Sequence, residues 1–544
     1  MDTYNIEVLK SGQRHLTINK NLADKYNLSK VKSILVRFGL KIMEVKLFIE
    51  EEHANMYIGL SKDIIEKLGI PTYCNFNIYV NSKKEIVIGP FIGLFMGKKE
   101  STIIKKLRVI NSFVQRYDKL NGAVFAFSLD NINKKNLTMD GYVFNPILNI
   151  WQRASLPFPA AIYKRSVFNT EWREYFGSIY GNKVFNYNSF DKWEMYERLR
   201  QFEDVRYFLP DTKLYKDLED IWVSLSQYEN IYIKPIDGKQ GLGIFNVVKN
   251  EKSILVKTRK KGENLSWSFT NKDDFLYFIS QKLEINKYII QQTLDIQIDS
   301  KAIDFRIGMD KDQLGKWNDT TFLSRVSGNE SIVSNRAAGG GEVKEISDTL
   351  KEIYKMNDVE KDRYQNELIS LAYKASIYLE ETGLSLGKLA FDMAIDSNNK
   401  IWIVEINSRY PDDSLVNSLG KRHVYYDTRH LNMLYAKKLS GFDHTTNDLV
   451  FNFAEFQEEI KSEEVKKIKV YVGVPLKERE GFKEYLAHII QESILEHLVS
   501  YDKSTQKFEL VLEGSFNEIV KIIKRIKSND NNKFSSVVSI IELD

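Results

Sequence analysis

Alternating apolar and polar positions define two neighbouring strands in the second half of the chain, over residues 388–396 and 401–407. Side chains on a strand point alternately to the two faces of a sheet, so a hairpin closed by the four residues between them fixes which side chains meet. In this register the carboxylates of Asp392 and Glu405 lie directly opposite each other, and Asn407 emerges on the face of Glu405. The other expected pairs are Asp396 with Ile401 and Ala394 with Ile403.

The first 97 residues contain an internal repeat of a strand, a polar cap and a short helix. The copies cover residues 16–28 and 59–70, and the matching lysines, Lys20 and Lys62, are 42 residues apart. With the alternating strands that flank it, this duplication predicts a small pseudo-two-fold β-barrel. Such a barrel either binds a substrate, a partner or another subunit, or is purely structural.

The remaining pattern predicts further α/β layers. Apolar runs at 122–128 and 161–163, which alternate with helical segments, are typical of parallel strands. After residue 445, a strand, a helix over 481–497, a strand, a helix and a strand predict a ferredoxin-like plait. The expected domains are a β-barrel-like domain over 1–97, an α/β lobe over 98–190, a core with the acidic hairpin over 191–444, and a ferredoxin-like domain over 463–544.

Composition narrows the class of protein. A chain of 544 residues with 43% hydrophobic content exceeds the usual size of one core. The single cysteine, Cys74, excludes intramolecular disulfides and cysteine-rich zinc sites. A net charge of +4 is too weak to indicate a nucleic-acid partner. We find no apolar run of about 20 residues and no secretory signal, so we expect a cytoplasmic protein with no membrane partner.

The acidic pair is the first candidate for chemistry. Like charges directly opposite each other on a ladder are unfavourable, and a divalent cation is the usual relief for such a cluster of hard oxygen ligands. Asp392, Glu405 and Asn407 are therefore the candidate metal ligands. The alternative is two exposed acids and a polar residue beside a turn, but the apolar residues around the acids argue against it.

A glycine-spaced loop follows an apolar strand at residues 231–235. Gly238, Gly241 and Gly243 let backbone N–H groups approach phosphate oxygens, and Lys234 adds a positive charge there. No Gly-Lys-Ser/Thr sequence opens a helix, so this is not a Walker loop. An ordinary hairpin turn is the alternative.

Two arginines lie on predicted strands between this loop and the acidic hairpin. Arg306 and Arg325 are candidates for contacts to a triphosphate, because a planar guanidinium suits phosphate oxygens. Each arginine taken alone is more often a solvated surface group.

The order of these features resembles that of the ATP-grasp superfamily. The features are the Lys-Pro strand with its glycine loop, the strand over 287–292, the two arginines, and the spacing of Asp, Glu and Asn in the hairpin. More narrowly, the chain resembles the YheC/YheD-type ATP-grasp proteins, described as endospore coat-associated, over residues 1 to 440. The phrases that carry this resemblance are Gly141-Tyr-Val-Phe-Asn-Pro146, Leu156-Pro-Phe-Pro-Ala-Ala-Ile-Tyr-Lys-Arg165, Asp191-Lys-Trp193, Leu209-Pro-Asp-Thr212, Ser331-Ile-Val-Ser-Asn335 and Trp402-Ile-Val-Glu-Ile-Asn407.

The resemblance implies ATP and Mg²⁺ as cofactors, with the acidic hairpin on the metal. It makes residues 98–190 the lobe that precedes an ATP-grasp core over 191–444. It also implies that Lys192 reaches the phosphates and that Gln291 or Gln292 hydrogen-bonds adenine. The residues it places on the nucleotide are Lys192, Lys234, Gly238, Gly241, Gly243, Gln291, Gln292, Arg306 and Arg325, of which Lys234, Arg306 and Arg325 are catalytic.

The activity that the resemblance implies is ATP-dependent ligation of a carboxylate and an amine through an acyl phosphate. The substrates expected are a peptide or amino-acid carboxylate and an amine, so that a peptide or protein is modified with an amino acid, in a cytoplasmic or spore-associated setting. A small-molecule kinase and a catalytically silent spore-coat protein are the alternatives. The sequence leaves open the two substrates, whether modification is repeated, the roles of the terminal domains, and the oligomeric state, with a homodimer as one alternative.

Two further segments carry weaker signals. Glu513-Gly-Ser-Phe-Asn-Glu518 resembles a turn of acylphosphatase-like domains, yet no catalytic arginine is evident, so we expect residues 463–544 to be an accessory, non-catalytic module. Residues 421–430 are rich in Lys and Arg and include His423 and His430. They form either a binding segment for an anionic substrate group or a solvated basic loop.

Overall fold

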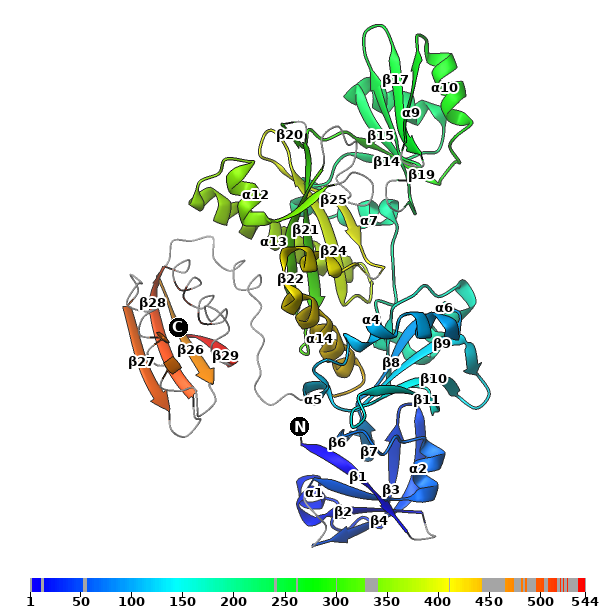
Figure 1. The fold of residues 1–544 in the computed structure, drawn as a ribbon, viewed down its shortest axis with the longest axis vertical. Helices are drawn as coiled ribbons and strands as arrows, with labels where there is room; N and C mark the ends of the chain where they lie inside the picture. The colour runs from blue at the N-terminus through cyan, green and yellow to red at the C-terminus, as the bar shows by residue number, and fades with distance from the viewer. Residues whose placement is uncertain are drawn as a thin grey trace. The chain divides into compact units, whose positions relative to one another are not determined.

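The structure is a computed structural model, and it describes most of the chain in two compact units (Figure 1). The first unit is Asp2–Asp443, and the second is His444–Asp544 with Met1. The described residues are 2–10, 14–51, 56–238, 242–260, 263–299, 301–327, 341–409, 411–442, 465–473, 481–482, 485–486, 496–502, 507–515, 519, 522, 526 and 537–543. No helix within them is long and apolar enough to cross a membrane.

Seven strands of the first unit close into a barrel in the order β1-β5-β2-β4-β3-β7-β6. Their alternate side chains, among them Leu16, Ile18, Ile58 and Leu60, fill its interior. The elements are β1 Thr3–Leu9, β2 His15–Asn19, α1 Lys20–Lys25, β3 Ser33–Phe38, β4 Lys41–Glu50, β5 Tyr57–Ser61, α2 Lys62–Leu68, β6 Phe76–Val80 and β7 Glu85–Gly89.

The barrel pairing follows the repeat in the sequence. The elements β1-β2-α1-β3 and β4-β5-α2-β6 have the same order. Parallel pairs join β1 to β5 and β4 to β2, while antiparallel pairs join β3 to β4 and β6 to β1. Each copy therefore completes its sheet with strands of the other copy.

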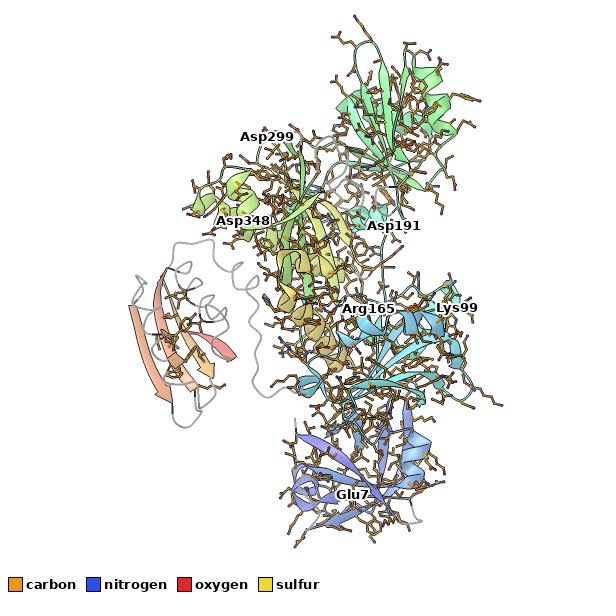
Figure 2. The ribbon with its side chains drawn as sticks, viewed as in Figure 1. Glu7, Lys99, Arg165, Asp191, Asp299 and Asp348 are labelled. Carbon is orange, nitrogen blue, oxygen red and sulfur yellow. The ribbon has the colours of Figure 1, made fainter. Side chains whose placement is uncertain are left out.

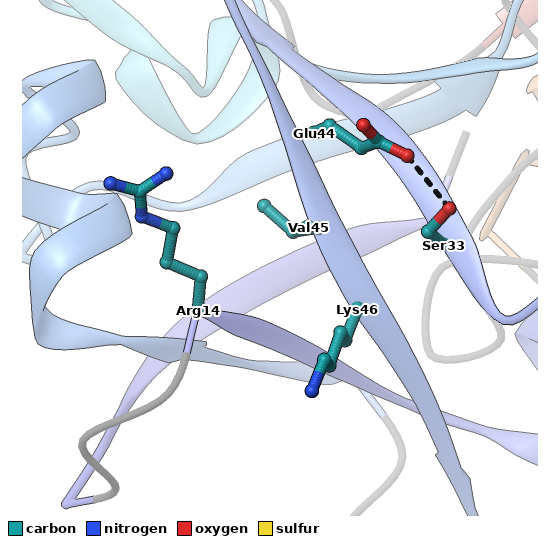
Figure 3. Close-up of a pocket in the computed structure, with 5 residues that line it drawn as sticks. All are labelled: Arg14, Ser33, Glu44, Val45 and Lys46. Carbon is teal, nitrogen blue, oxygen red and sulfur yellow. Dashed lines mark hydrogen bonds between the residues drawn. The ribbon is translucent and has the colours of Figure 1, made fainter.

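A shallow pocket of about 490 Å³ opens on the barrel (Figure 3). The side chains of Arg14, Ser33, Glu44, Val45 and Lys46 line it, and the Ser33 hydroxyl donates to Glu44 at 2.8 Å. Its strands, β3 and β4, share no ladder with those of the acidic hairpin.

The second sheet has the order β11-β10-β9-β8-β12-β13. The pairs among β8, β9, β12 and β13 are parallel, whereas β9-β10-β11 is an antiparallel meander. The elements are β8 Phe91–Gly97, α3 Glu100–Lys105, α4 Leu107–Asn111, α5 Tyr117–Leu120, β9 Ala123–Asn133, β10 Thr138–Asn145, β11 Ile150–Pro157, β12 Ala161–Lys164, α6 Thr170–Tyr180, η1 Gly181–Lys183 and β13 Val184–Phe185.

This sheet corrects one expected boundary. The barrel-like domain was expected to run to residue 97, but Phe91–Gly97 pairs with β9 and β12 and so belongs to the second sheet. The chain leaves the barrel at the cis Gly89-Pro90 bond. The apolar run over 85–97 looks continuous because both strands are buried on both faces, so the pattern alone does not show where one sheet ends.

The third sheet is fully antiparallel, in the order β14-β19-β15-β16-β17-β18. Helices α9 and α10 supply apolar faces to its core, with Leu225 and Phe275 fully buried. The elements are α7 Lys192–Leu199, α8 Glu203–Arg206, β14 Thr212–Leu214, α9 Leu218–Tyr228, β15 Asn230–Pro235, β16 Phe245–Lys249, β17 Ile254–Lys260, β18 Glu263–Phe269, α10 Lys272–Ser280 and β19 Tyr288–Gln292.

The fourth sheet, β23-β22-β21-β24-β25, carries the acidic hairpin, and β20 pairs with β21 beside it. The elements are β20 Gln297–Ile298, β21 Lys301–Lys311, β22 Trp317–Val326, β23 Glu342–Glu345, α12 Ile346–Glu352, α13 Asp358–Glu381, β24 Lys388–Ile395, β25 Ile401–Asn407, η2 Ser414–Leu419 and α14 Arg422–Leu439.

The hairpin of β24 and β25 confirms one predicted pair and corrects two. Asp392 pairs with Glu405 as predicted, but Ala394 pairs with Trp402, and Ile395 rather than Asp396 pairs with Ile401. The Asp396 carboxylate accepts hydrogen bonds from the N–H groups of Asn398 and Lys400, which tightens the turn to three residues. A β-bulge after Asp392 restores the register at the acids.

Helix α14 and Asn186 tie the second sheet to the fourth. Asn186 accepts hydrogen bonds from the N–H groups of Gly387 and Lys388, and it donates to the carbonyls of Lys388 and Ser408. Its φ of 53°, an angle that asparagine tolerates, aims its amide at both strands. On α14, Asn432 accepts a hydrogen bond of 2.7 Å from the Tyr163 hydroxyl of β12.

The second unit contains the antiparallel sheet β27-β28-β26-β29. Its strands are β26 Val465–Gly473, β27 Glu496–Asp502, β28 Lys507–Ser515 and β29 Val537–Leu543. The helix expected over 481–497 does not include its last two residues, because Glu496 and His497 begin β27 and pair with β28. Most residues of the expected helices lie outside the described residues, so the ferredoxin-like assignment stays a prediction.

Candidate functional site

The acidic hairpin sits beside two arginines on one face of the fourth sheet. Arg306 lies directly across from Asp392 on the neighbouring strand β21, and its Nε is 2.8 Å from the Asp392 Oδ1. The Arg325 Nη2 is 3.1 Å from the same oxygen. All three side chains are at least 86% buried, so water screens the attraction between their charges only weakly.

Arg325 is held by a second acid, Asp304, its direct partner across the β21-β22 ladder. The Arg325 Nε and Nη2 donate to the two Asp304 oxygens at 2.5 and 2.8 Å, a bidentate pair. Burial alone would lower the pKa of Arg325, but Asp392 and Asp304 raise it above its usual value. Arg325 is therefore a fixed positive charge at Asp392.

Lys192 connects Glu405 to the glycine loop. Its Nζ is 3.2 Å from the Glu405 Oε1 and donates to the Gly238 carbonyl at 3.0 Å. The residue opens α7, where Asp191 and Glu194 form a capping box that fixes the first turn. The predicted phosphate-loop glycine and the predicted metal ligand thus meet at one lysine.

Lys234 is the second-last residue of β15. Its Nζ donates to the Gln291 Oε1 at 2.7 Å, and the Gln291 amide donates in turn to the Thr212 hydroxyl at 2.9 Å. Burial lowers the pKa of Lys234 to about 8; the Glu405 carboxylate opposes this shift and the Lys192 charge adds to it. An incoming anionic group would therefore meet a lysine whose charge the protein alone does not fully stabilise.

The structure places some of the other predicted nucleotide contacts near Lys234 and others away from it. The Gln292 Oε1 accepts a hydrogen bond of 2.8 Å from the Asp211 N–H, so Gln292 holds the chain at β14, whereas Gln291 faces Lys234. Gly243 has a φ of +73°, and a Cβ there would lie 3.1 Å from Pro235. Gly241 lies outside the described residues.

The donor set at the hairpin fits Mg²⁺. Two carboxylates and an amide are the hard oxygen ligands that Mg²⁺ prefers, and they come from neighbouring positions of two paired strands. The Asn407 Nδ2 donates to the Asp392 Oδ2 at 3.3 Å, so the two side chains are in direct contact. No group of three His, Cys, Asp or Glu side chains among the described residues could hold a metal, so the amide is needed to complete this set.

Three partners in this site were missed in the sequence. Asp304 and Arg409 were not singled out, and Thr212 was named only as part of a family phrase. The Arg409 Nη2 is 2.7 Å from the Asp237 Oδ1 of the glycine loop. Its position two residues after Asn407 was the available signal, since the end of a strand that carries ligands lies at the site.

Comparisons with known proteins match part of this chain to one family. Residues 181–439 match the model of the family described as YheC/D-like ATP-grasp. The chain is 26% identical to the endospore coat-associated protein YheD of Bacillus subtilis over 419 residues, 74% of this chain and 90% of YheD. It is 22% identical to YheC of the same organism over 295 residues, 52% of this chain and 79% of YheC.

Among solved structures, the chain resembles D-alanyl-alanine synthetase A from Vibrio cholerae. The TM-score is 0.38 with 9% sequence identity, over 65% of this chain and 98% of the synthetase.

Proposed function

Because residues 181–439 form an ATP-grasp domain of the YheC/D type, we propose that this protein is an ATP-dependent ligase that activates a carboxylate and joins it to an amine. One observation carries the proposal. Arg306 and Arg325 converge on Asp392, while Lys192 joins the opposing Glu405 to the glycine loop. Cationic groups and hard oxygen ligands therefore share one site, which is the composition that transfer of a phosphoryl group requires.

In this proposal one set of residues binds the metal and another binds the phosphates. Asp392, Glu405 and Asn407 would hold Mg²⁺, which supplies neutralisation of charge on phosphate oxygens. When the nucleotide enters, Arg306 and Arg325 exchange a contact to Asp392 for contacts to the triphosphate. Lys192 and Lys234 do the same near the glycine loop, and Gln291 is the proposed adenine contact.

The proposed reaction needs no nucleophilic side chain. The substrate carboxylate oxygen attacks the γ-phosphorus of ATP, the bond to the bridging oxygen breaks, and ADP leaves. The amine nitrogen then attacks the carbonyl carbon of the acyl phosphate, the bond from carbon to the phosphate oxygen breaks, and the nitrogen loses a proton. The products are an amide, ADP and phosphate.

We assign the substrates by class. A peptide or an amino acid supplies the carboxylate, and an amino acid or peptide supplies the amine, in the cytoplasm of a sporulating cell. The relatives YheD and YheC are named as endospore coat-associated, which supports the link to sporulation. The carboxyl-terminal unit is the proposed accessory module for a large acceptor.

Hydroxylamine tests the reaction class. An acyl phosphate reacts with hydroxylamine to give a hydroxamate, so we expect hydroxamate and ADP to form together when the full chain is incubated with Mg²⁺, ATP, hydroxylamine and a library of amino acids and short peptides. The Asp392→Asn variant serves as the control and should form neither. A stable phosphoester with no hydroxamate would replace the ligase with a kinase and leave the nucleotide site as described.

A further inference from the structure

A second charged cluster lies on the fourth sheet, four residues along β24 from Asp392. The Lys388 Nζ is 2.8 Å from Asp310 and 2.7 Å from Asp413, and all three side chains are at least 95% buried. The ammonium group of Lys388 thus bridges two carboxylates. Asn432 and Thr320 donate further hydrogen bonds to Asp310, at 2.5 Å each.

Arg429 of α14 approaches this cluster without completing it. Its Nη2 is 3.9 Å from the Asp413 Oδ2, beyond hydrogen-bonding distance, and its Nε and Nη1 are buried with no hydrogen-bond partner. The guanidinium carbon lies 4.5 Å from the ring centre of Phe113 and 4.4 Å from that of Tyr425. Both rings lie within the distance of a cation–π contact, but such a contact provides no acceptor for the N–H groups of Arg429.

Arg165 directly follows the last residue of β12 (Figure 2). Its guanidinium carbon is 5.5 Å from the ring centre of Phe113, the ring that Arg429 also contacts. Its Nη1 donates to the Tyr163 hydroxyl at 3.2 Å, and the side chain is partly exposed. Two like charges therefore lie near one aromatic ring, and one of them is open to solvent.

The charges of this cluster do not balance. Lys388, Arg429 and Arg165 supply three positive charges, whereas Asp310 and Asp413 supply at most two negative ones. Burial of an uncompensated charge is costly, so the unpaired donors of Arg429 and the excess charge favour an anionic occupant.

We propose that Arg429 and Arg165 form a subsite for a carboxylate group of the substrate, one that is not phosphorylated in the reaction. The identification of the occupant as substrate rests on the proposed ligase function. A carboxylate accepts hydrogen bonds from guanidinium N–H groups, and the Nε and Nη1 of Arg429 have no partner beside the rings of Phe113 and Tyr425. These rings also offer an apolar surface to the carbon chain that bears the carboxylate.

The position of the subsite limits the length of the substrate. Lys388 and Asp392 project from the same face of β24, four residues apart, which is about 13 Å along a strand. The Lys388 cluster, which Arg429 adjoins through Asp413, therefore lies about that far from the acidic hairpin, and we expect a molecule with a carboxylate at each place to be about as long as a short extended peptide. A single small amino acid is too short for both.

Binding of small carboxylates to the full chain tests the subsite without ATP or catalysis. We would titrate acetate, glutarate and inorganic phosphate separately by ligand-observed NMR, with wild type, Arg429→Met, Arg429→Lys and Arg422→Met. Arg422 is the matched control because it lies exposed at the start of the same helix. We expect acetate and glutarate to bind wild type and Arg422→Met alike, and to bind Arg429→Met and Arg429→Lys at least about tenfold more weakly.

The outcomes separate this inference from the proposed function. Absence of carboxylate binding to wild type up to about 10 mM overturns the subsite, and so does equal binding by the Arg429 variants. Phosphate that binds as tightly as acetate, and that loses this binding in Arg429→Met, overturns the carboxylate assignment. Unchanged MgATP affinity and melting temperature in Arg429→Lys show that a loss of carboxylate binding is local. Failure of wild type to bind ATP would contradict the proposed ligase function. The carboxylate titrations would still test the Arg429 subsite in that case.

Discussion

Replacement of Asp392 by asparagine is expected to lower magnesium-dependent ADP formation about 10³-fold, the largest effect of any single change in this site. Asp392 is the proposed metal ligand, and it is also the carboxylate on which Arg306 and Arg325 converge. The amide keeps the shape of the side chain but removes its charge, so metal binding weakens while the fold is retained. Steady-state ADP release, measured against magnesium concentration, gives the result.

A partial recovery of the rate at high magnesium would show that a metal ligand has been weakened. The control is Asp348→Asn, an exposed acid in the first turn of α12 that should leave the rate unchanged (Figure 2). If Asp392→Asn releases ADP at the wild-type rate at every magnesium concentration, the hairpin is not the metal site.

Replacement of Lys234 by methionine is expected to lower ADP formation about 10²-fold, because the variant loses one fixed donor to phosphate oxygens and keeps the apolar stem. The side chain donates to Gln291 in the nucleotide-free protein, so that amide loses a partner as well. Single-turnover rates with saturating MgATP give the size of the effect. A variant that matches wild type would remove Lys234 from the site.

The pH dependence of MgATP binding gives Lys234 a second signature. Burial holds its pKa at about 8, below the usual 10.5, so the lysine loses its proton as pH rises through 8. Phosphate favours the protonated form, and we expect the Kd for MgATP to rise up to about tenfold per unit above pH 8. Calorimetric titrations at pH 7, 8 and 9 should show this slope in wild type and not in Lys234→Met. The same slope in both proteins would assign the titration to another group.

The same shift has an opposite consequence for the nucleotide-free protein. Between about pH 8 and 10.5 the unfolded chain binds the proton that folded Lys234 has lost. The contribution of Lys234 to the free energy of unfolding is therefore complete above pH 10.5 and falls as pH decreases through 8. Binding of ATP and stability of the free protein respond to pH in opposite directions at this residue.

Local sequence patterns predicted the strands of the site but not all of their details. Alternation along β24 and β25 was sufficient to oppose Asp392 and Glu405. It could not show the tighter turn, because the side-chain hydrogen bonds of Asp396 that fix the turn leave the hydrophobic pattern unchanged. The β-bulge after Asp392 compensates for the tighter turn, and the hydrophobic pattern did not show it either.

Contacts between distant segments were not predictable from periodicity. Arg409 pairs with Asp237 across a separation of 172 residues, and Arg429 and Arg165 contact the same ring from positions 264 residues apart. Both contacts depend on how the sheets and helix α14 pack. The basic stretch over 421–430 was read as either a binding segment or a solvated loop. The structure places most of it in α14, with Arg429 buried, so the loop is excluded.

Calorimetric titration of ATP into the full chain, with and without Mg²⁺, tests the central claim most directly. Asp392, Glu405 and Asn407 would hold the metal on which the triphosphate depends, while Lys192 and Lys234 act on the phosphates near the glycine loop. We expect micromolar binding with Mg²⁺ and at least about tenfold weaker binding without it. Binding that is equal with and without the metal, or no binding in either case, would contradict the account.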